Sequence, residues 1–135
     1  LYRTLEETAR PARMQLLERM LSSLEYVGPV AIMCIRSTDF QETDGSSTDL
    51  IGLVNTPMVL ENIQASILLT DTDPTVTKMS FRSKPSLPGQ PTSLIDVNQL
   101  ANKFDGGGHI HAAGARVFST LEDVKARLIE LLKEI

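Results

Sequence analysis

Apolar and polar positions alternate along the chain in ways that predict short helices and strands. Residues 11–25 carry apolar side chains at helical spacing, and Pro11 suits a first helical turn because its missing N–H is not needed there. Residues 29–36 form a short, continuously apolar run, which is typical of a buried central strand. Residues 63–70 and 75–83 alternate with a period of two and are separated by turn residues, so we expect a hairpin.

The remaining segments complete an α/β pattern. The elements predicted besides these are two short helices within 37–57, a helix at 96–104, a short strand at 115–118 and a helix from 121 onward. Pro57 is expected to close the second short helix, because the residue before a proline avoids helical geometry. The proline-rich segment 84–92 predicts an irregular loop. This order predicts an α/β fold with a single mixed β-sheet of about four to five strands, flanked by helices.

The length and charge of the chain limit the classes of function that it can have. The 135 residues are enough for one domain with an ordinary core. Seventeen acidic and thirteen basic residues give a net charge of −4. A protein that binds duplexes without sequence preference normally has a basic surface, so the charge argues against that class. A small phosphorylated ligand held by one or two local cations remains compatible with it.

Cys34 is the only cysteine, so an internal disulfide is impossible. It lies in the apolar run 29–36, and we expect its thiol to be buried rather than reactive. The sequence has neither the long apolar run of a membrane-spanning helix nor a signal peptide. We therefore expect a cytoplasmic protein with no membrane partner.

Residues 105–114 contain the most unusual composition and both histidines of the chain. Three consecutive glycines, Gly106, Gly107 and Gly108, precede His109. Such a run leaves no side chains between the backbone and a ligand, and a helix starting after it would attract anions. Neither the Walker A pattern nor the full dinucleotide fingerprint is present. There are two alternatives to a ligand-binding role for His109. It could be a turn histidine bonded to a carbonyl, or part of a His-x-His metal site, which lacks further ligands here.

Arg82 lies at the end of the strand predicted at 75–83. A period of two places it on one face with Lys78 and Ser80, and Ser83 on the opposite face. The planar guanidinium of arginine matches phosphate oxygens, and a serine hydroxyl can donate a hydrogen bond. The alternative is a solvated strand arginine beside a serine that only begins the loop.

The glycine–histidine stretch resembles a known family. Its sequence GGGHIHAAG, at residues 106–114, fits the GGGHxxAAG signature of the DHH-associated C-terminal domain of DHH-family phosphoesterases. The segments 52–57 (GLVNTP), 79–84 (MSFRSK) and 95–98 (IDVN) resemble further family motifs in the same order. The pattern is most similar to the bacterial branch of nano-RNases and pAp phosphatases, which degrade very short oligoribonucleotides and dephosphorylate adenosine 3′,5′-bisphosphate (pAp).

The resemblance implies a division of labour between two domains. In the family, an upstream domain carries an Asp-His-His motif and binds two divalent metals, usually manganese, while the C-terminal domain holds the substrate. This chain contains no Asp-His-His triplet, so the resemblance implies no metal ligands here and manganese in an upstream domain. Residues 1–27 would be a helical linker or N-terminal helix from that domain, and residues 28–135 the substrate-binding domain. The parent protein would be a phosphodiesterase or phosphatase, and this fragment alone would be inactive.

The residues carried over by position form one candidate substrate site. They are Arg82, Ser83, Gly106, Gly107, Gly108 and His109. The implied partners are a short single-stranded oligonucleotide or a mononucleotide, and the upstream domain of the same protein; a homodimer is left open. The alternatives are a nucleic-acid-binding or assembly module without phosphoesterase activity, as in the related domain of alanyl-tRNA synthetases, and a domain whose glycines only pack.

Overall fold

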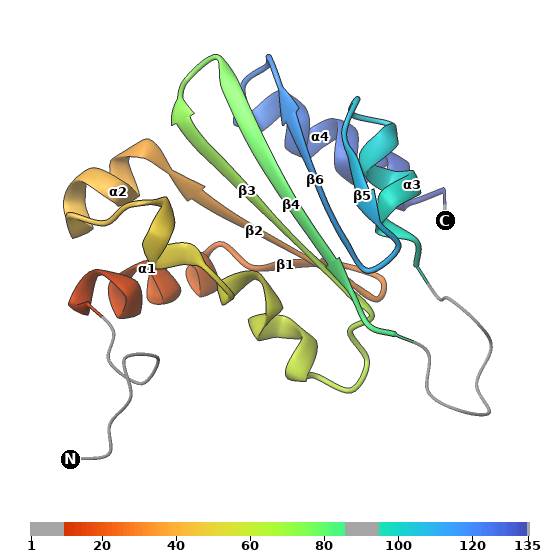
Figure 1. The fold of residues 1–135 in the computed structure, drawn as a ribbon, viewed down its shortest axis with the longest axis horizontal. Coiled ribbons are helices and arrows are strands. Elements are labelled where there is room, and N and C mark those ends of the chain that lie inside the picture. The colour runs from red at the N-terminus through yellow and green to blue at the C-terminus, as the bar shows by residue number, and fades with distance from the viewer. Residues whose placement is uncertain (1–9, 86–94, 135) are drawn as a thin grey trace.

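The computed structural model describes residues 10–85 and 95–134, which form one mixed sheet with helices on both faces (Figure 1). The strands are β1 (Glu25–Val27), β2 (Val30–Arg36), β3 (Ala65–Asp73), β4 (Val76–Ser83), β5 (Gly107–His109) and β6 (Ala112–Val117). Their order across the sheet is β1-β2-β3-β4-β6-β5. Strands β2 and β3 are parallel and all other neighbours are antiparallel.

The sheet has six strands, so the prediction of four to five was too low. The two additional strands, β1 and β5, are three residues long and lie at the two edges of the sheet. A strand this short shows no periodicity, and glycine has a low strand propensity. Both strands depend on hydrogen bonds to a longer neighbour, which no local pattern reveals.

The helices also depart from the sequence pattern in detail. They are α1 (Pro11–Ser22), α2 (Ser37–Thr43), α3 (Val97–Asn102) and α4 (Leu121–Leu132), with 3-10 segments η2 (Ser47–Leu50) and η3 (Leu53–Val59). The second predicted short helix is two 3-10 segments, interrupted at Gly52, whose φ is +83°. Pro57 lies inside η3 instead of closing a helix, so that prediction was wrong. The predicted loop at 84–92 lies largely outside the described residues.

The buried strands and the hairpin were predicted correctly. The apolar run becomes β2, buried at every position except its last, and the two alternating segments pair as β3 and β4. The last strand, predicted at 115–118, starts earlier, at Ala112. The glycines before it form β5, and the expected helix start there is instead a turn at Ile110 and His111.

Two hydrophobic clusters cover the two faces of the sheet. Helices α3 and α4 pack on one face, where Phe81, Phe104 and Leu121 are almost fully buried (Figure 1). Helix α1 and segment η3 pack on the other face, where Leu16 and Met20 are fully buried. This second face is covered mainly over β2 and β3, because its apolar residues come from those strands. The prediction that an upstream catalytic domain precedes helix α1 stays a prediction.

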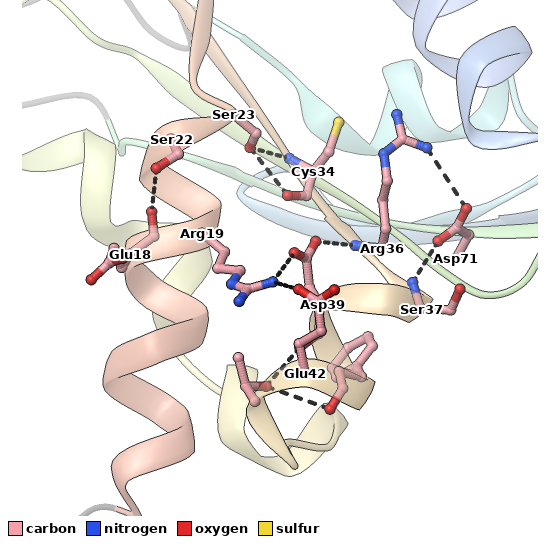
Figure 2. Close-up of polar contacts among 12 residues, drawn as sticks. Glu18, Arg19, Ser22, Ser23, Cys34, Arg36, Ser37, Asp39, Glu42 and Asp71 are labelled. Atoms are coloured by element: carbon pink, nitrogen blue, oxygen red, sulfur yellow. Dashed lines mark hydrogen bonds and ion pairs between the residues drawn. The ribbon is translucent and has the colours of Figure 1, made fainter.

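Polar contacts fix α1 and α2 against the end of β2 (Figure 2). The Arg19 guanidinium pairs with Asp39, at 3.1 Å, and with Glu42. Asp39 also accepts the backbone N–H of Arg36 at 2.8 Å, which supports the start of α2. Just after α1, the Ser23 hydroxyl accepts the backbone N–H of Cys34 at 2.8 Å. The bonds of Arg19 and Asp39 hold α2 against α1 and the end of β2.

Candidate ligand-binding cleft

A cleft of about 940 Å³ lies over β4 and β6, beside the part of the sheet that α1 and η3 cover. Its floor includes Lys78, Ser80 and Arg82, which share one face of β4 as their alternation predicted. Its opposite side is formed by α2 and the 3-10 segments, with apolar side chains such as Phe40 and Leu50. A volume of this size is ordinary for a site that binds a small molecule.

The cleft differs in charge from the rest of the chain. Among its described lining residues, Lys78, Arg82 and Arg116 are basic and none is acidic. The whole sequence has a net charge of −4. None of the ion pairs found among residues 10–85 and 95–134 involves these three cations. An anionic ligand would therefore meet three cations that form no ion pair with a carboxylate of the described residues.

Strand register brings Arg82 and His109 into one row. Arg82 of β4 lies directly opposite Ala112 of β6, and Ala112 lies directly opposite His109 of β5. Directly opposed residues of antiparallel strands project to the same face, so both side chains flank the small alanine. Two strand spacings separate their backbones by about 10 Å. His109 is exposed and lies on the edge strand, whereas the described cleft lining includes Arg82.

The glycines line the cleft, but two of their amides are already engaged. Gly106 donates its N–H to the Ala101 carbonyl at 2.9 Å, and Gly108 donates to Asn98 Oδ1 at 2.9 Å. A Cβ on Gly106 would lie 2.6 Å from the Cβ of Ala115 and still closer to the backbone of β6. The absence of side chains therefore lets β5 approach β6 closely. A ligand would meet the Cα surface of these glycines rather than a row of free amides.

Ser83 lies away from the cleft. Ser83 is buried, and its side chain lies on the face of β4 that packs against α3 and α4. The Ser83 hydroxyl lies 3.0 Å from His111 Nδ1 and donates to the Ile110 carbonyl at 3.1 Å. Ser83 is therefore positioned to hold the turn between β5 and β6, and the structure does not bring it together with Arg82.

Three residues of this site were missed as functional candidates. Lys78 could have been chosen from the alternation of β4, which places it on the face of Arg82. Arg116 could not have been chosen from the sequence, because only the pairing of β6 with β4 brings it to the cleft. Asn98 belongs to the IDVN segment, but its bond to the glycine stretch joins residues ten positions apart. No local signal predicts that bond.

The structured part of the chain provides no metal centre. Within residues 10–85 and 95–134, no three His, Cys, Asp or Glu side chains are grouped as metal ligands. In the same residues, no helix combines the length and the apolar character needed to cross a bilayer. The basic side chains in the described lining of the cleft are suited to bind and orient an anion.

Several solved structures of other proteins contain a fold similar to this one. It is similar to an exopolyphosphatase-related protein from Bacteroides fragilis, with 28% identity and a TM-score of 0.77 over 98% of this chain and 39% of that protein. It is also similar to PggH, a pGpG-specific phosphodiesterase from Vibrio cholerae, with 14% identity and a TM-score of 0.55 over 91% of this chain and 39% of the other. An uncharacterized protein from Helicobacter pylori G27 aligns with 18% identity and a TM-score of 0.50, over 91% and 32%.

These likenesses show a fold that occurs within phosphoesterases. No protein-family profile matches the sequence. No curated protein sequence matches it either. The chain spans about two fifths of the length of the first two similar structures.

Proposed function

We propose that this chain is the substrate-binding domain of a DHH-family, metal-dependent phosphoesterase. Its substrate would be a short single-stranded oligonucleotide or a small phosphorylated nucleotide such as pAp. The observation that carries the proposal is the charge of the cleft, where Lys78, Arg82 and Arg116 are present without any acidic residue among the described lining. The similarity to an exopolyphosphatase-related protein and to a phosphodiesterase supports the phosphoesterase class.

Arg82 and His109 are proposed to bind the phosphate. Arg82 lies half-buried in the cleft, and its only partner among the described hydrogen bonds is the carbonyl of neighbouring Phe81. The remaining guanidinium donors are free to form a forked pair of bonds to phosphate oxygens. His109 would donate from the edge strand on the same face. The glycines of the neighbouring row, Gly107 and Gly114, would give the ligand close access to the backbone.

Hydrolysis is proposed to take place on a second domain. The described residues do not fit a metal site, so the metals, proposed to be manganese, would be bound by an upstream Asp-His-His domain. Such metals would supply an activated water and polarise the phosphate. The role of this chain would be to hold the phosphate and exclude other orientations. By itself the chain would bind the substrate without turnover.

Binding of pAp to the 135-residue chain tests this proposal. Arg82→Gln is expected to weaken binding by about 1.5–3 kcal/mol, because a charge-assisted hydrogen bond is removed. That change corresponds to roughly a 10- to 150-fold higher Kd by calorimetry or fluorescence titration. His109→Ala should weaken binding in the same direction. Lys133→Gln, at an exposed lysine after α4 on the other side of the sheet, is the control and should change nothing.

Adenosine without phosphate should bind far more weakly than pAp to the unaltered chain. Equal affinity for both compounds, or unchanged affinity in Arg82→Gln, would remove the phosphate role of the cleft. Preference for a long single strand over pAp would favour the alternative of a nucleic-acid-binding module without phosphoesterase activity.

A further inference from the structure

Lys78 and Arg116 form an unusual pair at one end of the cleft. They lie directly opposite each other on β4 and β6, and both line the cleft. Like charges in directly opposed positions of neighbouring strands are destabilising. Both residues are exposed, and neither forms an ion pair with a carboxylate among the structured residues. The fold therefore keeps two cations together at a cost that an anion could offset.

The pair is separated from Arg82 by a floor of small residues. Lys78 and Arg82 lie four positions apart on the same face of β4, which corresponds to about 13 Å of extended strand. The row between them consists of Ser80, Gly114 and Gly107, which are directly opposed across three strands. The cleft thus has positive charge at both ends and little side-chain bulk in the middle.

We propose that Lys78 and Arg116 form a second phosphate subsite, for a phosphate of a short single strand that is not adjacent to the one held at Arg82. The inference rests on the proposed function. The backbone positions of the two ends lie about 13 Å apart along β4, which a strand of a few nucleotides spans more readily than a mononucleotide does. A longer chain can place its sugars over the small-residue floor and reach both cationic ends. The subsite thereby makes the cleft prefer an oligonucleotide of a few residues to a mononucleotide.

Two probes of different length separate this subsite from the first. Adenosine 5′-monophosphate carries one phosphate, and 5′-phosphorylated triadenylate carries phosphates at non-adjacent positions. In the double variant Lys78→Gln/Arg116→Gln, the affinity of the 135-residue chain for triadenylate should fall at least tenfold. Its affinity for the monophosphate should change less than twofold. The triadenylate affinity should also depend less on salt, with the log–log slope reduced by about 0.7 for each phosphate that the variant no longer neutralises.

Folding is controlled in the same experiment. The double variant should keep or raise its urea unfolding midpoint, because it removes a like-charge pair from the sheet surface. Lys133→Gln is the matched control, since it removes an exposed cation outside the cleft lining. It should leave the affinity for both probes unchanged. An equal fall in triadenylate affinity in this control would overturn the subsite.

The outcomes distinguish this inference from the proposed function. Triadenylate binding that survives the double variant but falls in Arg82→Gln would overturn the second subsite and leave the proposed function intact. An equal fall for both probes in the double variant would also overturn it, since the pair would then act only through its general field. Weaker triadenylate binding in the double variant, with no effect of Arg82→Gln on either probe, would support an anion site here and contradict the phosphate role of Arg82.

Discussion

Gly106 and Gly107 are neighbours, but a side chain at each would meet different surroundings. A Cβ at Gly106 would collide with the backbone of Gly114 and lie 2.6 Å from the Cβ of Ala115, neither of which can move without shifting β6. A Cβ at Gly107 would lie 3.3 Å from the side-chain oxygens of Asn98 and Asn102, which would need to shift by only a few tenths of an ångström. The glycine run therefore has a packing role at its first position.

Gly106→Ala is accordingly expected to destabilise the fold by about 1–3 kcal/mol, as overpacking does in a closely packed site. Gly107→Ala is the matched control and should cost less than about 1 kcal/mol, because only flexible side chains need to adjust. Urea unfolding of both variants measures the difference. Equal stability of the two would contradict the close approach of β5 to β6.

Ser83 shows how one residue separates sequence resemblance from geometry. The resemblance placed Arg82 and Ser83 in one candidate site, whereas the alternation of β4 already put their side chains on opposite faces. The structure agrees with the alternation and engages the Ser83 hydroxyl with Ile110 and His111. Its contribution to binding is therefore proposed to be indirect, through the turn that follows His109.

Among the elements, β5 depends most on its neighbours. It has three residues, two of them glycines, and lies at the edge of the sheet beside β6. Helix α3 holds it from the other side, because Asn98 accepts the Gly108 N–H and Ala101 accepts the Gly106 N–H. The N-terminus of that helix is in turn capped by Asp96, which accepts two backbone N–H groups. The IDVN segment thus positions the glycine–histidine stretch.

Asn98→Ala should loosen β5 locally. Removing one hydrogen bond of about 1 kcal/mol should speed hydrogen exchange of the Gly108 amide about fivefold, as measured by NMR. Asn102→Ala, one turn further along the same face of α3 and also close to Gly107, is the control, since the described hydrogen bonds include none from its side chain. Equal Gly108 exchange rates in the unaltered chain and in Asn98→Ala would contradict the role of this bond.

On the scale of the whole molecule, charge is distributed unevenly. The chain is acidic overall, yet the described cleft lining contains only basic ionisable side chains. Three acidic side chains are instead engaged near the C-terminal end of β2, where Asp39 and Glu42 pair with Arg19 and Asp71 accepts the Ser37 N–H (Figure 2). This separation leaves a positive surface for an anion on a molecule whose net charge repels nucleic acid.

The buried Cys34 links global stability to pH. Burial raises the pKa of its thiol above the ordinary value of 9.0. Below that pH the thiol is protonated in both the folded and the unfolded chain, so its contribution to stability is fully present. As the pH rises above 9.0, the unfolded chain ionises first, and stability is lost until the folded thiol ionises as well.

Between about pH 8 and pH 10, the unaltered chain should therefore lose more stability than Cys34→Ala, by up to about 1 kcal/mol. Urea unfolding at several pH values measures the stability of both proteins. Cys34→Ala is the reference for the unaltered chain, because lysines and tyrosines titrate in both proteins. Parallel stability profiles for the two proteins would show that the Cys34 thiol ionises equally in both states.

The sequence by itself determined what local periodicity can encode. The buried run of β2, the β3–β4 hairpin, the two faces of β4 and the caps Asp96 and Thr120 all follow from neighbouring residues. Tertiary structure alone decided the edge strands β1 and β5, because each forms only by pairing with another strand. It also decided that Arg116 faces Lys78 and that His109 shares a row with Arg82. Register between strands distant in sequence depends on the packing of the whole sheet, and no local pattern contains that information.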